Sequence, residues 1–123
     1  MVAIKVLNKT NLNRIMETLK KEIVYLKKLD SPNIVKYYET FEDAHYVYIV
    51  MEYCEGKDLF EILHRRTKRN RALKEEETID IMYKVFKAIG HCHTLGIAHR
   101  DIKPENIIIG MEAELKVIDF GLA

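Results

Sequence analysis

The sequence of 123 residues predicts an α+β fold, and three patterns carry that prediction. The alternation along residues 2–7 is typical of a strand, and two further strand-like runs occupy residues 34–41 and 46–51. Apolar residues recur at three- and four-residue steps along residues 11–29 and 75–95, as they do in amphipathic helices. No repeat, Gly/Ser linker or low-complexity tract divides the chain, which we interpret as one continuous piece.

The first strand and the first helix each carry one charge on an otherwise apolar face. The two faces of the strand are Val2, Ile4 and Val6 on one side and Ala3, Lys5 and Leu7 on the other. The apolar stripe of the helix consists of Leu12, Ile15, Leu19, Ile23 and Leu26. Lys5 therefore lies on an apolar strand, and Glu22 falls within the apolar stripe of the helix.

Lys5 and Glu22 can compensate each other if the strand packs against the helix. A lone inward ammonium or carboxylate is costly, whereas a pair offsets part of that cost. The alternative is that Lys5 extends to solvent and Glu22 lies on the edge of the stripe. If only one of the two residues were considered, this alternative would be preferred. The motifs farther along the chain favour the ion pair between Lys5 and Glu22.

Several turns and helices are predicted after the first helix. Residues 30–33, Asp-Ser-Pro-Asn, break the chain, and residues 42–45 predict a hairpin turn between the two strand-like runs. Residues 58–64 predict a short helix, and Gly96 is a C-cap candidate for the long helix over residues 75–95. The expected apolar face of that long helix is Ile79, Met82, Val85, Phe86, Ile89 and Cys92.

A basic run at residues 64–74 separates the last two predicted helices. Its closely spaced cations are Arg65, Arg66, Lys68, Arg69 and Arg71. Such a run can recognise phosphate or acidic peptides or direct nuclear import, but it is more often a solvated loop, here followed at once by three glutamates. We interpret it as a solvated loop and keep recruitment of an acidic or phosphorylated substrate as the alternative.

Composition indicates a globular protein without a strong overall field. The chain is 48% hydrophobic and 32% charged, with a net charge of +1, so we expect no nucleic-acid partner. The longest apolar runs are too short to span a bilayer, so we expect no membrane insertion. Cys54 and Cys92 form no disulfide framework or CxxC pair, which favours a reducing compartment, the cytoplasm or the nucleus.

Two motifs near the end of the chain carry chemistry: the octapeptide HRDIKPEN at residues 99–106 and Asp119-Phe120-Gly121. They supply a proton acceptor in Asp101, a cation in Lys103, and two oxygen ligands for magnesium in Asn106 and Asp119. Phosphoryl transfer requires this set of groups, because the protein orients the attacking hydroxyl and neutralises phosphate charge. Either motif alone favours a polar loop, but the two together in this order favour chemistry.

With these motifs and the VAIK strand, the chain resembles the eukaryotic protein kinase family. The resemblance implies a partial bilobal kinase fold, with residues 1–51 in the N-lobe, residues 52–58 as the hinge, and residues 59–123 as the start of the C-lobe through DFG. It implies ATP and Mg²⁺ as cofactors. By the same resemblance Lys5 holds the α- and β-phosphates and Glu22 fixes its position.

The resemblance also implies the residues around the adenine and the ribose. Adenine recognition at a hinge uses mostly backbone groups, so these residues are assigned by their position in the sequence and not by their side chains. The implied nucleotide-binding set, beyond Lys5, Asn106 and Asp119, is Met51 as gatekeeper, Glu52 and Cys54 through backbone groups, Asp58 at the ribose, Ala3 and Ile108 against the ring, and Glu105.

The acceptor and the regulation are implied in the same way. Lys103-Pro104-Glu105 is similar to the catalytic loop of serine/threonine kinases, so a protein serine or threonine hydroxyl is the expected acceptor. The middle of the chain is similar to calcium/calmodulin-dependent and calcium-dependent kinases. Arg100 suggests control by activation-loop phosphorylation, and hence an upstream activating kinase.

The resemblance covers essentially the whole sequence, but the sequence covers only the middle of a catalytic domain. A complete kinase has a Gly-rich loop before the VAIK strand and continues past DFG. We therefore expect an open edge on the first strand, and low solubility or dependence on a missing segment for the isolated chain. The alternative to a kinase fragment is a catalytically inactive, truncated kinase-like module that acts in binding or regulation.

Overall fold

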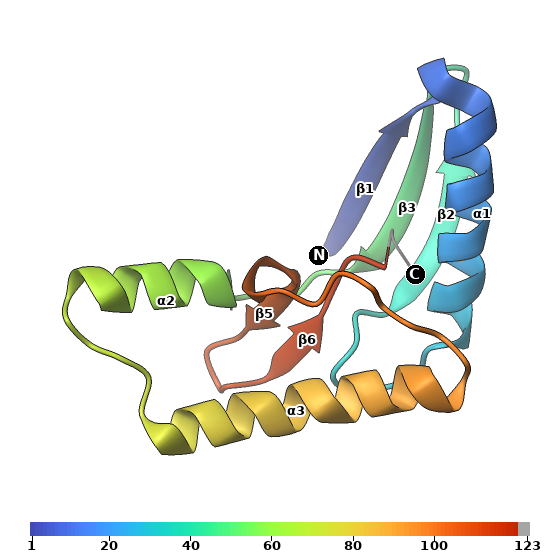
Figure 1. The fold of residues 1–123 in the computed structure, drawn as a ribbon. Helices are drawn as coiled ribbons and strands as arrows, with labels where there is room; N and C mark the ends of the chain where they lie inside the picture. The colour runs from blue at the N-terminus through green and yellow to red at the C-terminus, as the bar shows by residue number, and fades with distance from the viewer. Residues whose placement is uncertain (121–123) are drawn as a thin grey trace.

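The structure is a computed structural model that describes residues 1–120, without the side chains of residues 11–15 (Figure 1). Its first part contains β1 (Val2–Asn8), a 3-10 helix (Lys9–Asn11), α1 (Leu12–Lys28), β2 (Tyr37–Glu42) and β3 (Tyr46–Glu52). Its second part contains β4 (Lys57–Asp58), α2 (Leu59–Lys68), α3 (Glu75–Thr94), a second 3-10 helix (Pro104–Asn106), β5 (Ile107–Ile109) and β6 (Leu115–Val117). The mixture of small sheets and helices confirms the predicted α+β class.

The first sheet has the order β1-β3-β2 with antiparallel neighbours, and α1 runs alongside it (Figure 1). The predicted alternation of β1 is present. Val2, Ile4 and Val6 are 46–52% exposed, whereas Lys5 and Leu7 on the opposite face are partly buried. The β1 strand therefore directs Lys5 toward the interior of the molecule.

The helix α1 begins after a short 3-10 turn and buries one side of its length. Leu19, Glu22 and Leu26 are at most 4% exposed, so the predicted stripe is present over this part of the helix. Leu12 and Ile15, which we also assigned to the stripe, have side chains outside the described residues. A carboxylate is thus held in an apolar helix face, as the sequence predicted for Glu22.

The segment before β2 corrects the prediction of a strand over residues 34–41. The strand begins only at Tyr37, and Ile34 instead forms a parallel bridge with Val117 in β6. The Val35 N–H donates to the Val117 carbonyl at 3.1 Å, and the Val117 N–H donates to the Asn33 carbonyl at 2.8 Å. Because these backbone groups pair with the second sheet, they are not available to β3, and β2 starts later.

The helix α2 is longer than the predicted residues 58–64. Asp58 is its N-cap, with Oδ1 accepting the Glu61 N–H at 2.8 Å, and the helix continues to Lys68. Arg65 lies 2.7 Å from Glu61 one turn earlier, a spacing that supports helix. The first residues of the basic run are therefore helical and not part of a loop.

The helix α3 matches the predicted long helix and ends in a Schellman motif at Gly96. The Gly96 N–H donates to the His93 carbonyl and the Ile97 N–H to the Cys92 carbonyl. Gly96 has φ of +71°, which glycine adopts without steric cost. The predicted C-cap role of Gly96 is thus confirmed, and the chain turns sharply toward His99.

The predicted apolar face of α3 is correct in part. The buried side consists of Val85, Ala88 and Cys92, with Ile81 and Ile89 partly buried. Ile79, Met82 and Phe86 are 40–62% exposed, so only part of the predicted apolar face is buried. The apolar face is broad, and the three- and four-residue steps alone do not distinguish its buried side from its exposed side.

The largest apolar cluster joins the second sheet to α3 and to the end of α1. Its most buried members are Leu26, Ile34, Val85, Ala88, Cys92, Leu115, Val117 and Phe120. The cluster includes Ile97 and Phe120, which are close in the sequence to Asp101 and Asp119, so the candidate site adjoins the packed core. Within residues 1–120, no helix combines the length and the apolar character needed to cross a bilayer.

The turn between β2 and β3 is organised by Asp43. Its Oδ1 accepts the backbone N–H groups of His45 and Tyr46 at 2.7 and 2.8 Å, and its Oδ2 accepts the Tyr48 hydroxyl at 2.7 Å. The Tyr48 hydrogen bond and then the two backbone hydrogen bonds lower the pKa of Asp43 from 3.8 to about 2.

Asp43→Asn should therefore destabilise the protein in a pH-dependent way. The folded-state pKa lies below the unfolded one, so the contribution of the carboxylate is full above about pH 4 and is lost as the pH falls toward 2. Thermal unfolding of both proteins between pH 6 and pH 2 measures this. Tyr48→Phe should lose part of the same pH dependence, and a stability difference that stays constant over the whole range would contradict the assignment.

Candidate active site

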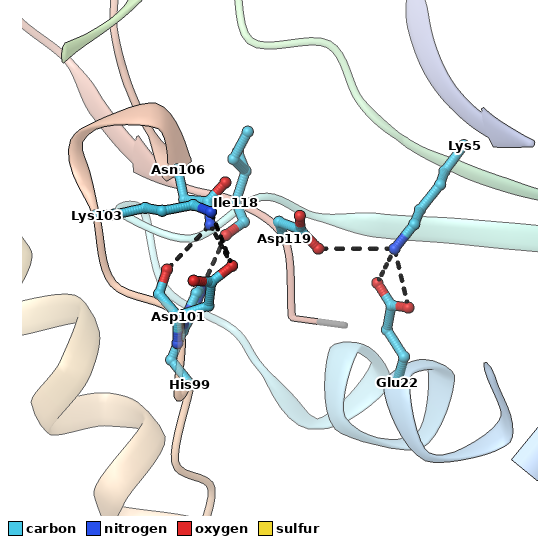
Figure 2. A network of polar contacts seen from close by, with 8 residues as sticks. All are labelled: Lys5, Glu22, His99, Asp101, Lys103, Asn106, Ile118 and Asp119. Carbon is cyan, nitrogen blue, oxygen red and sulfur yellow. Dashed lines mark hydrogen bonds and ion pairs between the residues drawn. The ribbon is translucent and has the colours of Figure 1, made fainter. Parts of the chain in front are cut away.

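The segment between α3 and β5 brings together Asp101, Lys103 and Asn106 (Figure 2). The Asn106 side-chain amide donates to both the Asp101 carbonyl at 3.0 Å and the Asp101 carboxylate at 3.1 Å. The Lys103 Nζ lies 3.5 Å from the same carboxylate. Pro104 starts the 3-10 turn, closed by the Asn106 N–H donating to the Lys103 carbonyl. The turn thus fixes the carboxylate of Asp101 between an amide and a cation.

His99 connects this segment to the chain after β6. Its Nδ1 accepts the Asp101 N–H at 3.1 Å, which places the ring proton on Nε2, where it donates to the Ile118 carbonyl at 2.8 Å. The imidazole also packs edge-on against Phe120, with ring centroids 4.5 Å apart. His99 is 4% exposed, so these contacts are buried and hold Asp101 and Asp119 in a defined relation.

Lys5 forms the other half of the site, and Asp119 lies between the two halves (Figure 2). The Lys5 Nζ lies 2.9 and 3.1 Å from the two Glu22 carboxylate oxygens, and 3.6 Å from Asp119 Oδ1. The Glu22 side chain is 5% exposed and that of Lys5 31%. The contact expected between Lys5 and Glu22 is therefore present, and the alternative of a solvated lysine does not hold.

A cavity of about 420 Å³ opens between the first sheet and the second. Of the predicted nucleotide-binding residues, its lining includes Ala3, Lys5, Met51, Glu52, Cys54, Ile108 and Asp119. The remaining lining residues, which the sequence did not suggest for this role, are Ile4, Glu22, Leu26, Val35, Tyr53, Ile118 and Phe120. The volume falls within the range of small-molecule sites, and charged groups occupy only part of a mostly apolar wall.

Three predicted nucleotide-binding residues lie outside the cavity lining. Asp58 caps α2, Glu105 is exposed in the 3-10 turn, and Asn106 contacts Asp101. Their roles toward a nucleotide stay predictions. Gly121, which ends the Asp119-Phe120-Gly121 motif, lies outside the described residues.

An ion pair between Glu52 and Lys116 at the connection between the two parts was not predicted. The Lys116 Nζ lies 3.0 Å from Glu52 Oε1, and Glu52 Oε2 also accepts the Lys36 N–H at 3.1 Å. Lys116 stands between two buried residues of β6. A single charge within a short apolar strand is the sequence feature that could have indicated this ion pair. The pair orients Glu52 at the wall of the cavity.

Two non-glycine residues of the site have left-handed backbone conformations. Arg100 has φ of +69° and Asp119 has φ of +58°. Such conformations cost about 1–3 kcal/mol each and persist where the surroundings impose them. The hydrogen bonds of His99 to Asp101 and to Ile118 flank both positions and supply that constraint.

The thiol of Cys54 lines the cavity without the character of a nucleophile. Burial, and then the negative charge of Glu52, raises the pKa of Cys54 above its ordinary value of 9.0. The thiolate is the reactive form of cysteine, so this thiol stays protonated at neutral pH. Cys54 therefore contributes shape and backbone groups to the cavity.

The donor set fits a hard divalent cation. The Asn106 amide nitrogen is engaged by Asp101, and its oxygen points away from that carboxylate, while Asp119 offers a carboxylate (Figure 2). Carboxylate and amide oxygens are the ligands that Mg²⁺ accepts together with phosphate and water. No group of three His, Cys, Asp or Glu side chains within residues 1–120 could hold a metal alone.

Comparison with known proteins places these features in one family. The family model described as "Protein kinase domain" matches residues 1–123. The chain is 40% identical to Calcium-dependent protein kinase 5 of Plasmodium berghei over 98% of this chain and 21% of that protein. It is 38% identical to CBL-interacting serine/threonine-protein kinase 24 of Arabidopsis thaliana over 99% of this chain and 27% of that protein.

A third relative is Aurora/IPL1-related protein kinase 2 of Caenorhabditis elegans, which is 39% identical over 98% of this chain and 39% of that protein. The chain thus spans about a fifth to two fifths of the length of these relatives. Three differently named groups of kinase are similar to it at nearly the same identity. The shared residues therefore indicate the family in general and not one group within it.

Lys5→Met should destabilise the protein because it leaves the buried carboxylate of Glu22 without its cation. An unsatisfied buried polar group costs about 1–3 kcal/mol, and more when it is charged. Adding Glu22→Leu should restore most of the lost free energy of unfolding, because the unpaired charge is removed. A double-mutant cycle by chemical denaturation measures this, and a double variant that loses the sum of the two single effects would contradict the pairing.

Proposed function

This chain belongs to the protein kinase family, and from that premise we propose that the protein carrying it transfers the γ-phosphoryl group of ATP to serine or threonine hydroxyls of proteins. The observation that carries the proposal is the arrangement of Asp101 with Asn106 and Lys103 next to a cavity lined by Lys5 and Asp119. The Lys103-Pro104-Glu105 sequence and the name of the Arabidopsis relative, a serine/threonine-protein kinase, support serine or threonine as the acceptor.

In the proposed reaction, Asp101 accepts the proton of the acceptor hydroxyl. The hydroxyl oxygen forms a bond to the γ-phosphorus, the bond from that phosphorus to the β–γ bridging oxygen breaks, and ADP leaves with the electron pair. Asn106 keeps the Asp101 carboxylate oriented through its amide, which favours a productive angle toward the hydroxyl. Lys103 supplies positive charge within 3.5 Å of that carboxylate, next to where the phosphate charge develops.

The cavity is the proposed site of the adenine ring. Ala3 and Ile108 stand in its lining as apolar walls, and the residues around Glu52 and Cys54 supply backbone donors and acceptors. Lys5 lines the cavity next to Asp119, which suits contact with the α- and β-phosphates. Glu22 then prevents the lysine from turning to solvent.

Magnesium is the proposed cofactor, with Asn106 and Asp119 as its protein ligands. Bound there, Mg²⁺ would neutralise part of the charge on the phosphate oxygens. The buried contacts of His99 with Asp101 and with the Ile118 carbonyl fix the position of Asn106 relative to Asp119. A protein substrate follows from the reaction, and Arg100, which is exposed, suits a phosphate placed by an upstream kinase.

Asp101→Asn should lower the rate of phosphoryl transfer about 10²–10⁴-fold, because the amide cannot accept the proton. ATP binding should be retained, because Asp101 does not line the cavity. Transfer from radiolabelled ATP to a serine peptide and calorimetric ATP binding measure the two effects. Asp80→Asn, an exposed carboxylate on α3 paired with Lys84, is the matched control and should leave the rate unchanged. Near-normal turnover of Asp101→Asn would overturn the mechanism.

Asp119→Asn should weaken ATP binding in the presence of magnesium and leave metal-free binding nearly unchanged. The physical reason is that the substitution removes the charged ligand proposed for the cation. Titrating ATP with and without EDTA separates the two. Equal weakening under both conditions would show that Asp119 does not act through the metal.

A further inference from the structure

A second charged hollow lies apart from the candidate active site, between the end of α2 and the start of α3. It measures about 580 Å³ and is lined by Arg65, Arg66, Arg69, Arg71, Ala72, Lys74 and Glu77. Five cations thus face one carboxylate. The loop between the two helices lies at the opposite side of the molecule from α1 (Figure 1), so a ligand in this hollow would not compete for the nucleotide cavity.

Inside the hollow, the chain's own Glu77 carboxylate is already held by basic residues. Arg66 holds the Glu77 carboxylate with two bonds of 2.7 Å, the fork geometry that arginine uses for carboxylate and phosphate. The Lys74 N–H donates to the same carboxylate at 2.8 Å. The hydrogen bond from Arg66, then that from Lys74, lowers the pKa of Glu77 to about 2.

The remaining cations have capacity for a further anion. Glu77 is engaged by Arg66, and Glu61 lies 2.7 Å from Arg65 outside the lining. Arg69 and Arg71, both exposed, have no side-chain hydrogen bond or ion pair with any other residue in the described part of the chain. Two guanidinium groups separated by one residue on the wall of a concave surface can each donate a pair of hydrogen bonds to one phosphate.

We propose that this hollow binds a phosphorylated serine or threonine in a protein partner or substrate. A phosphate monoester carries about two negative charges and three acceptor oxygens, which match Arg69 and Arg71 better than a single carboxylate does. The concave, solvent-open shape leaves room for one phosphate group with a few flanking residues. A nucleic acid would instead require a longer basic track, and the chain as a whole has a net charge of only +1.

This site goes beyond phosphoryl transfer, because it would recruit a protein that already carries a phosphate. Its affinity is independent of turnover and can be measured without ATP. A loss of phosphoryl transfer would therefore not change phosphopeptide binding, and a loss of phosphopeptide binding would not disprove phosphoryl transfer.

The test compares binding of an Ala/Gly peptide with one central phosphoserine to binding of its unphosphorylated form, by calorimetry with the protein that carries this chain. We expect measurable binding of the phosphopeptide only, with inorganic phosphate as a weaker competitor. Arg69→Gln/Arg71→Gln should weaken binding tenfold or more. Lys68→Gln/Lys87→Gln removes the same charge from α2 and α3 outside the hollow and should change it less than threefold.

A third variant separates geometry from charge. Arg69→Lys/Arg71→Lys keeps the positive charge but removes the paired guanidinium donors. Its affinity for the phosphopeptide should therefore fall between those of the unmodified protein and Arg69→Gln/Arg71→Gln. Circular dichroism checks that each variant is folded, and all three variants change exposed side chains. The proposal is overturned if the two phosphorylation states bind alike, if both glutamine variants weaken binding equally, or if Arg69→Gln/Arg71→Gln binds normally. Tighter, arginine-dependent binding of a single-stranded DNA 20-mer would also overturn it.

Discussion

The backbone pairing between residues 33–35 and Val117 joins the two sheets, and the geometry of the candidate active site depends on it. Val35 and Val117 each donate one hydrogen bond across this contact, and the Asn33 side chain donates a third to the Leu115 carbonyl at 3.0 Å. Ile34 and Val117 are each 1% exposed, so water does not compete for these bonds. Lys5 comes from one sheet and Asp119 follows the other, so the 3.6 Å between them requires this junction.

The same constraint explains why the strained residues lie where they do. β6 ends at Val117, and the next three residues have different surroundings. The Ile118 carbonyl accepts a hydrogen bond from His99, Asp119 is exposed, and Phe120 is buried. A single left-handed residue reverses the direction of the side chains over so short a distance. The buried ring of Phe120 and the His99 hydrogen bonds offset the cost, and the result is a carboxylate held at the edge of the cavity.

The parts of the site that depend on short-range pattern could be predicted from the sequence. Lys5 and Glu22 each interrupt a regular apolar face, so their burial and their contact follow from periodicity and from the cost of a lone charge. The start of β2 could not be predicted, because Ile34 has the composition of a strand but pairs with a residue 83 positions away. Nor could the buried side of α3, since Phe86 and Val85 both satisfy helical spacing and only the packed structure distinguishes them.

The charge balance around the basic run at residues 64–74 also could not be predicted from the sequence alone. In the sequence its cations are followed by three glutamates, which favours a neutralised, solvated loop. In the structure only Glu77 of those three turns into the hollow, so the balance of charge there is five cations to one carboxylate. In the candidate active site, by contrast, Lys5 at the cavity already faces two carboxylates, and Lys103, outside the cavity lining, faces Asp101. The cations of the candidate active site are thus paired with carboxylates that orient them, whereas Arg69 and Arg71 have no such partner among residues 1–120. The first arrangement suits a site that positions groups for a reaction, and the second suits a site that retains an anion.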